Sequence, residues 1–271
     1  MKKAALILTA GILLLPIYFL IVGSFQDVEG IFAMPPALLP LEPTMHNYHW
    51  VFDRPVLMWA ANTLVITAAT VVLSTAVSCM AGYGFAFYDW RGKKALWLLL
   101  LAGIMIPMIS LIIPRFVVMR QLGLGGTRLA VILPALLAPA HLYLARNYFE
   151  TVPRAILDSA RMDGANELQT LTRIVAPISK PIIACLAIFT AVGSMGDYLW
   201  PMLQLQKEGR RTLLIGLIGA TREYYGDITD MVINPLGLQF AVAVVLLVPT
   251  LLVFFAASRY FVGALGGAIK E

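Results

Sequence analysis

Cysteine, histidine and charged residues are all scarce in this sequence of 271 residues. The two cysteines, Cys79 and Cys185, lie inside apolar runs, so neither a disulfide framework nor a cysteine-based metal site is expected. The three histidines, His46, His49 and His141, show no metal-ligand spacing. Charged residues make up 13% of the chain, against about 25% in soluble domains. This composition excludes an ordinary soluble enzyme, a disordered chain and a nucleic-acid-binding protein.

Apolar residues are abundant instead, at 60% of the chain with a mean hydropathy of +0.83. A helix needs roughly 20 mostly apolar residues to cross a bilayer. Lipid offers the backbone no hydrogen-bond partners, so such runs must be helical. The sequence therefore predicts an all-α integral membrane protein, with residues 1–271 forming a single transmembrane domain. The six predicted spans are residues 4–22, 62–88, 95–113, 129–146, 181–205 and 236–258.

The first apolar run allows two interpretations. Lys2 and Lys3 before it and Val22-Gly23-Ser24 at its end are typical of a cleaved signal peptide. The run is longer than a usual signal core, however, and five further spans follow it. These two features favour a retained membrane anchor.

Lysine and arginine are unevenly distributed among the predicted loops. With the N-terminus inside, 12 of the 20 basic residues lie on the inner side and 8 on the outer side. This modest excess, in a chain of net charge +5, predicts cytoplasmic N- and C-termini. Residues 24–61 and 206–235 then form outer loops, and residues 147–180 form a long inner loop.

The first half of the inner loop has the pattern of a short helix. Pro153 suits the beginning of a helix. Ala155, Ser159 and Met162 share one face at a period of about 3.6 residues. Most side chains on this face are small, which would let the helix approach another protein closely. The alternative is an amphipathic loop that lies on the membrane surface.

The second half of the inner loop predicts a turn and another helix. Asp163-Gly164 should end the first helix, because glycine readily adopts the left-handed conformation of a sharp turn. A second helix is expected from near Asn166 to Val175, and Pro177 should stop it.

The spacing in this loop resembles the inner-loop signature of bacterial ABC importer permeases. That signature reads E-A-A, three residues, G, nine residues, I, one residue, L-P. Every spacing is kept here, although Asp replaces Glu, Ser replaces Ala and Ala replaces Leu. The matching residues are Asp158, Ser159, Ala160, Gly164, Ile174, Ala176 and Pro177.

The resemblance to the carbohydrate-uptake, maltose-transporter-like permease family extends over nearly the whole chain. Residues 32–48 resemble the first outer loop of that family, and residues 62–64 resemble the beginning of its second span. Residues 198–201 are similar to the end of its fifth span, and residues 261–270 to its tail. The turn at residues 195–197 departs from the family, which usually has Trp-Asn there.

The resemblance implies the type I ABC importer permease fold and a coupling helix that docks on a cytoplasmic ATPase. It also implies a multi-pass location in a bacterial cytoplasmic (inner) membrane. The implied partners are a second homologous permease subunit, two ATP-binding cassette subunits and an external substrate-binding protein. The chain has no G-x-x-x-x-G-K-[ST] loop, so ATP with magnesium belongs to the partner ATPase, and the chain binds no cofactor and is not an enzyme. The implied ATPase-coupling residues are Asp158, Ser159, Ala160, Met162, Asp163, Gly164, Ala165, Ile174 and Pro177.

Five residues are candidates for the translocation path: Asn62, His141, Tyr143, Asp197 and Tyr198. Asp197 is the one ionisable side chain predicted inside a span; it either lines a water-filled route or lies at the outer interface. Asn62 is either a helix cap or a ligand. Aromatic rings in the path would suit the apolar face of a sugar.

Together these features predict a permease subunit of an ATP-driven, binding-protein-dependent importer for a sugar or oligosaccharide. An importer for glycerol phosphate, a polyol or an amino acid is the first alternative. A phosphate would call for arginine or lysine in the path, and the sequence shows none there. An ion-coupled secondary transporter would need several intramembrane acids, whereas only Asp197 qualifies. A membrane scaffold without transport activity would leave the loop signature unexplained.

Overall fold

The computed structural model describes residues 2–26, 30–31, 38–40, 42–226 and 235–268. Within these ranges the chain is helical and forms no strand, which confirms the predicted all-α class. The remaining parts of the two predicted outer loops and of the C-terminal tail lie outside the described residues. Contacts group the chain into two compact units, one of residues 1–62 and 211–251 and one of residues 63–210 and 252–271. The single transmembrane domain stays a prediction.

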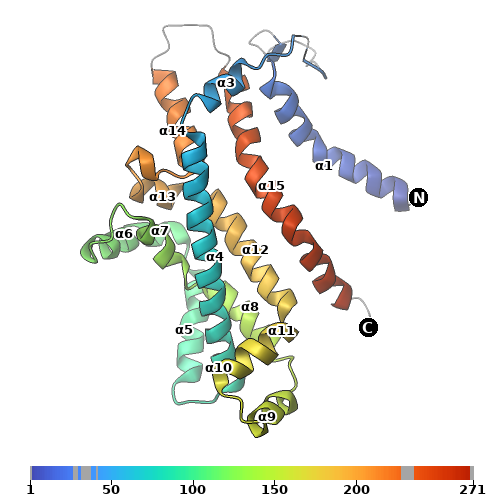
Figure 1. Ribbon diagram of the computed structural model, residues 1–271, viewed down its shortest axis with the longest axis vertical. Helices are drawn as coiled ribbons and strands as arrows, with labels where there is room; N and C mark the ends of the chain where they lie inside the picture. The colour runs from blue at the N-terminus through green and yellow to red at the C-terminus, as the bar shows by residue number, and fades with distance from the viewer. Residues whose placement is uncertain (1, 27–29, 32–37, 41, 227–234, 269–271) are drawn as a thin grey trace. The chain divides into compact units, whose positions relative to one another are not determined.

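The first unit contains α1 (Lys2–Ser24), α3 (His46–Phe52), the beginning of α4 (Val56–Phe87), α14 (Leu213–Gly226) and the first half of α15 (Pro235–Ala268) (Figure 1). Its core joins α3, α4, α14 and α15, because each of them directs apolar side chains inward. The buried residues of this core are Val51, Val56, Trp59, Leu213, Leu217, Ala220, Leu238, Ala241 and Val242.

The second unit contains most of α4 and a series of shorter helices (Figure 1). These are α5 (Lys93–Met105), α6 (Ile112–Gln121), α7 (Arg128–Ile132), α8 (Pro139–Phe149), α9 (Arg154–Met162), α10 (Glu167–Gln169), α11 (Ala176–Ile178), α12 (Lys180–Gly196) and α13 (Leu199–Gln204). A π-helical turn, Thr170–Val175, connects α10 to α11.

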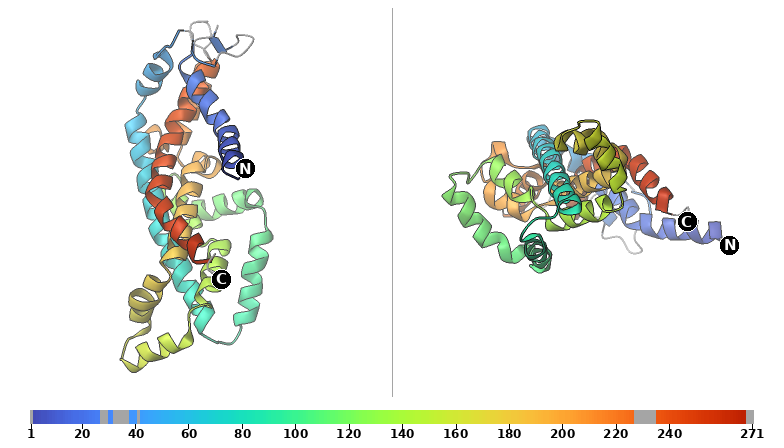
Figure 2. Two further views of the ribbon diagram at one scale, coloured as in Figure 1. Left: turned by 90° about the vertical axis from the view of Figure 1, so that its right-hand side faces the viewer. Right: turned by 90° about the horizontal axis from the view of Figure 1, so that it is seen from below.

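Proline accompanies three sharp bends in the second unit. The helices at residues 93–105 and 108–121 meet at 105° (Figure 2). Those at 128–135 and 139–149 meet at 43°, and those at 167–178 and 180–196 meet at 88°. Pro107, Pro139 and Pro181 stand at these breaks; proline has no N–H to continue a helical ladder, so the helix ends or bends there.

In the part of the chain that the structure describes, three helices are long and apolar enough to cross a membrane: Lys3–Ser24, Val56–Phe87 and Leu236–Phe255. The three bent pairs raise the number to six if each pair counts as one span. The predicted span at 95–113 therefore includes a right-angled turn. The predicted span at 181–205 is divided, because α12 ends at Gly196 and α13 begins at Leu199.

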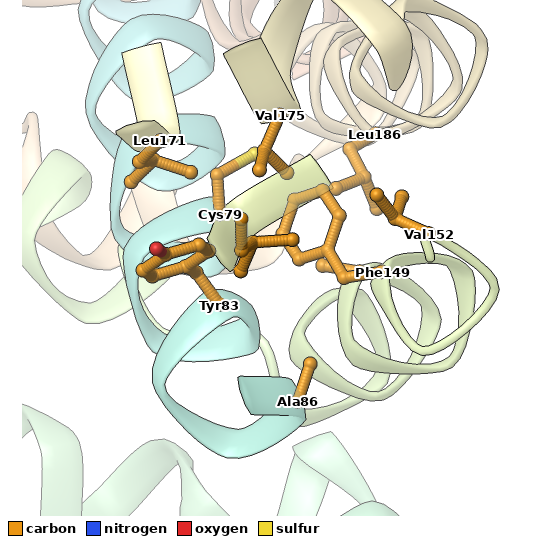
Figure 3. Packing of buried hydrophobic residues seen from close by; sticks show 10 residues of the cluster. Cys79, Tyr83, Ala86, Phe149, Val152, Leu171, Val175 and Leu186 are labelled. Atoms are coloured by element: carbon orange, nitrogen blue, oxygen red, sulfur yellow. The ribbon is translucent and has the colours of Figure 1, made fainter. Parts of the chain in front are cut away.

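One apolar cluster of the second unit joins α4, α8, α9, the π-helical turn and α12. Phe149, Val175 and Leu186 are fully buried in it, and Tyr83 and Leu157 are almost so (Figure 3). The predicted inner loop is therefore packed onto the C-terminal end of α4, which gives α9 a fixed base.

Candidate functional site

Helix α9 is amphipathic, and its outward face is open to a partner. Pro153 precedes it in an extended conformation, and the helix runs from Arg154 to Met162. Leu157 and Ala160 are 2% and 4% exposed and face the chain's own core. Met162 on the opposite face is 84% exposed and has charged neighbours.

The turn after α9 has the conformation that the sequence predicts. Gly164 has a φ of +81°, and no atom lies within 4 Å of the position that a Cβ would occupy. Backbone strain, not crowding, therefore requires glycine there. The N–H of Ala165 donates to the carbonyl of Ala160 at 3.0 Å, which closes the end of the helix.

The second loop helix begins with a reciprocal cap. The backbone N–H of Gln169 donates to the side chain of Asn166, and the backbone N–H of Asn166 donates to the side chain of Gln169, both at 2.9 Å. The helical path continues to Ile178, so the expected stop at Pro177 was wrong. The π-helical turn before it has already interrupted the usual ladder, and the missing N–H of proline is tolerated.

The structure divides the nine predicted coupling residues into three groups by exposure. Ala160 is buried and packs within the chain, so it presents no surface to a partner. Ala165 and Ile174 are half-buried. The exposed residues are Asp158, Ser159, Met162, Asp163, Gly164 and Pro177.

A polar cluster at the base of α9 was missed by the sequence analysis. Glu167 Oε2 accepts a hydrogen bond from the Tyr83 hydroxyl at 2.7 Å, and Glu167 Oε1 accepts one from Arg161 Nε at 3.2 Å. The hydroxyls of Tyr88 and Tyr83, together with the Arg161 charge, hold the pKa of Glu167 below its ordinary value. The N-x-x-Q cap at Asn166 marks the beginning of this helix in the sequence, but no sequence pattern connects Glu167 to Tyr83.

Asp197 lies between α12 and α13, in an extended conformation, and not inside a continuous span. Its Oδ1 accepts a hydrogen bond from the backbone N–H of Trp200 at 3.4 Å. The Arg115 guanidinium lies 4.9 Å from the centre of the Trp200 ring and interacts electrostatically with Asp197. Arg115 is half-buried, so a cation stands close to Asp197, and the expectation of no arginine or lysine in the path stays a prediction. Tyr198 immediately precedes α13.

His141 and Tyr143, two further candidates for the path, contact different helices. His141 Nδ1 lies 3.4 Å from Thr190 Oγ1 on α12, whereas the Tyr143 ring stacks on Trp97 of α5 with centroids 6.0 Å apart. His141 therefore contacts α12, and Tyr143 contacts α5.

Asn62 belongs to the other unit and lies inside α4, which begins at Val56, so the helix-cap interpretation was wrong. It is 3% exposed, and its Nδ2 donates to the carbonyl of Arg211 at 2.9 Å. This bond ties α4 to the segment that leads into α14.

Among the residues that the structure describes, no three His, Cys, Asp or Glu side chains converge where they could hold a metal ion.

Comparison with known proteins identifies relatives over nearly the whole chain. Residues 74–262 match the family described as binding-protein-dependent transport system inner membrane component. The arabinooligosaccharides transport system permease protein AraQ of Halalkalibacterium halodurans is 33% identical, with 96% of this chain and 92% of that protein covered. AraQ of Bacillus subtilis is 32% identical, with 95% and 90% covered.

A solved structure shows the same fold. The crystal structure of a bacterial ABC transporter involved in the import of the acidic polysaccharide alginate contains a chain that superposes with a TM-score of 0.82 at 25% identity. The match covers 96% of this chain and 95% of that chain, so the predicted type I importer permease fold is confirmed. The chain belongs to the family of binding-protein-dependent transport system inner membrane components, and is thus a transporter subunit and not an enzyme.

Proposed function

We propose that this chain is one of two membrane subunits of an ATP-driven importer for a sugar or oligosaccharide. Its relatives support the solute class, because arabino-oligosaccharides and alginate are both carbohydrates. The proposed complex contains a second permease, two ATPases that bind ATP with magnesium, and an external binding protein.

The proposed membrane arrangement has six spans with both termini in the cytoplasm. This number is supported by three single helices and three bent pairs, if each pair counts as one span. The excess of lysine and arginine on one side supports the orientation. The outer loops at 24–61 and 206–235 would then receive the binding protein, and α9 would lie on the cytoplasmic side.

The observation that carries the coupling proposal is the exposure of Met162. A methionine that is 84% exposed at the end of an otherwise polar face gains by inserting into a pocket on another protein. Asp158, Ser159 and Asp163 surround it with polar groups, which is the usual composition of an interface rim. The cytoplasmic ATPase is the partner that we propose for this face, and movement of the ATPase would displace α9.

For the translocation path, we propose Asp197, Tyr198 and His141. Asp197 lies where the backbone leaves a helix, and such breaks at membrane depth normally line a cavity or are buried in protein. Arg115 partly balances its charge, which favours a neutral, hydroxyl-rich solute. Asn62 and Tyr143 already take part in helix packing and are weaker candidates.

Two methionines of equal exposure offer a matched test of coupling. Met162 on α9 and Met105 at the end of α5 are both 84% exposed. We expect Met162→Ala to weaken retention of the ATPase subunits during purification roughly tenfold, the effect of losing about 1.4 kcal/mol. Met105→Ala should leave retention unchanged. Equal retention in both variants would contradict docking through α9.

Solute class is tested by reconstituting the complex in proteoliposomes with the binding protein. We expect ATP hydrolysis to rise when arabinotriose or another oligosaccharide is added, and not with glycerol 3-phosphate. Stimulation by glycerol 3-phosphate alone would replace the sugar proposal with the phosphate alternative.

A further inference from the structure

The carboxylate of Glu167 uses its two oxygens to connect two separate elements. Oε2 accepts from the hydroxyl of Tyr83 on α4 at 2.7 Å, and Oε1 accepts from Nε of Arg161 on α9 at 3.2 Å. Glu167 itself is the first residue of α10. One side chain therefore joins α9, α10 and α4.

The α4 end of this connection is firmly held. Tyr83 is 5% exposed, and its ring belongs to the apolar cluster that contains Cys79, Phe149, Leu171 and Val175 (Figure 3). The ring cannot move without displacing close-packed neighbours. A hydrogen bond from its hydroxyl to a carboxylate is charge-assisted, and such bonds are shorter and stronger than neutral ones.

The α9 end is held by a planar guanidinium with several contacts. Besides Glu167, Arg161 pairs with Asp158 at 3.5 Å and donates to the Tyr88 hydroxyl at 3.4 Å. Its charge also lies 5.8 Å from the centre of the Tyr88 ring. Each of these exposed contacts is weak alone, but the rigid fork of arginine holds them in one geometry.

Apolar packing alone would transmit only part of a movement of α9. Leu157 rests on the cluster around Tyr83, and such a contact resists closer approach but allows sliding and separation, because dispersion has no preferred direction. A charge-assisted hydrogen bond is directional. The contacts of Glu167 therefore resist movement of α9 away from α4 and along it.

We propose that Glu167 is a positioning residue that clamps α9 to α4 through Tyr83 and Arg161, so that displacement of the coupling loop moves α4 as well as α12. The inference rests on the proposed function, since it presumes that a partner moves α9. Helix α12 follows the loop directly along the chain, whereas α4 is connected to it only through tertiary contacts.

Each of the two helices carries one native cysteine. Cys79 lies on α4 one turn before Tyr83, and Cys185 lies on α12. Both thiols are free; Cys79 is buried and Cys185 is half-buried. The rate at which such a thiol is alkylated rises when its surroundings loosen. We would measure alkylation of each by N-ethylmaleimide with mass spectrometry, in the assembled transporter, with and without MgATP.

Three conservative variants separate the clamp from simple packing. Glu167→Gln removes the charge, and Tyr83→Phe removes the hydroxyl while the ring remains. Tyr148→Phe is the matched control, because Tyr148 packs against the same cluster but is not a partner of Glu167. In the protein without substitutions we expect MgATP to change the alkylation rates of both cysteines.

With Glu167→Gln or Tyr83→Phe, the ratio of the Cys79 rates with and without MgATP should move toward unity, because only apolar packing still transmits the movement, while the Cys185 response persists. Tyr148→Phe should keep both responses. A Cys79 response of undiminished size in both clamp variants overturns the inference. So does loss of both responses, or a chain without substitutions that responds at Cys185 alone; these outcomes leave the proposed function standing. If MgATP changes the alkylation rate of neither cysteine in the protein without substitutions, both the proposed function and the inference are contradicted.

Discussion

Gly82 on α4 lies directly against Ala145 on α8. A Cβ on Gly82 would lie 2.8 Å from the Cβ of Ala145 and 3.0 Å from the backbone nitrogen of Arg146. Ala145 is fully buried. Close backbone approach at small residues is the usual way in which helices pack in membranes, where lipid provides no hydrophobic force between them.

This contact predicts opposite effects for two identical substitutions. Gly82→Ala should lower the free energy of unfolding by about 1–2 kcal/mol, because the overpacked helices must separate. On the same helix, the Cβ added by Gly84→Ala would have no atom within 4 Å. This substitution should raise the free energy of unfolding by up to about 1 kcal/mol, since alanine favours helix. Thermal unfolding of both variants in detergent checks this. Equal stabilities would contradict the close contact.

A similar contact exists in the first unit, where a Cβ on Gly216 would overlap the indole of Trp59. Trp59 is 1% exposed, so it has little room to move. We expect Gly216→Ala to displace the indole and to cost about 1–3 kcal/mol, measured by denaturant unfolding and near-UV circular dichroism. Gly219→Ala is the control, because its Cβ would make only an ordinary 3.6 Å contact with Arg211. A native near-UV spectrum for Gly216→Ala would refute the expectation.

The cap at Asn166 should stabilise the second loop helix. Asn166→Ala removes the acceptor of the Gln169 N–H, and loss of such a cap costs about 0.5–2 kcal/mol. The backbone amides of residues 167–175 should exchange faster, by the factor that corresponds to this loss of free energy. Thr172→Ala, which removes an exposed hydroxyl bonded only within its own helix, should change exchange much less. Unchanged exchange in Asn166→Ala would show that packing alone holds the helix.

The inner loop should lose stability in acid. The pKa of Glu167 lies below its ordinary value of 4.5, because the hydroxyls of Tyr88 and Tyr83 and the charge of Arg161 favour the carboxylate. A group whose pKa is lower in the folded state stabilises fully above its ordinary pKa and ceases to do so as the pH falls through the folded value.

We therefore expect hydrogen-exchange protection of the loop to be constant from pH 7 to about pH 5 and to fall below that. Glu167→Gln should have lower protection at neutral pH and a flatter profile. If the variant and the unmodified protein lose protection in parallel, another group is responsible.

Local patterns predicted the class of the protein and the turn in the inner loop. Apolar runs are properties of single segments, so their lengths indicate membrane helices without coordinates. Gly164 has its positive φ where the sequence places the turn, because only glycine adopts that backbone conformation readily. The same local view failed at Pro177, where a π-helical turn changes what proline does to the helix.

What the sequence determined by itself is therefore the all-helical membrane class, the helix–turn–helix of the inner loop and, through the spacing of its signature, the permease family. The tertiary structure decided which residues meet: Glu167 with Tyr83, Arg115 with Trp200, and Gly82 with Ala145. Periodicity encodes which face of a helix is apolar, but it carries no information about which distant helix packs on that face. A pair such as Tyr83 and Glu167, 84 positions apart, comes together only because the folded core places α10 beside α4.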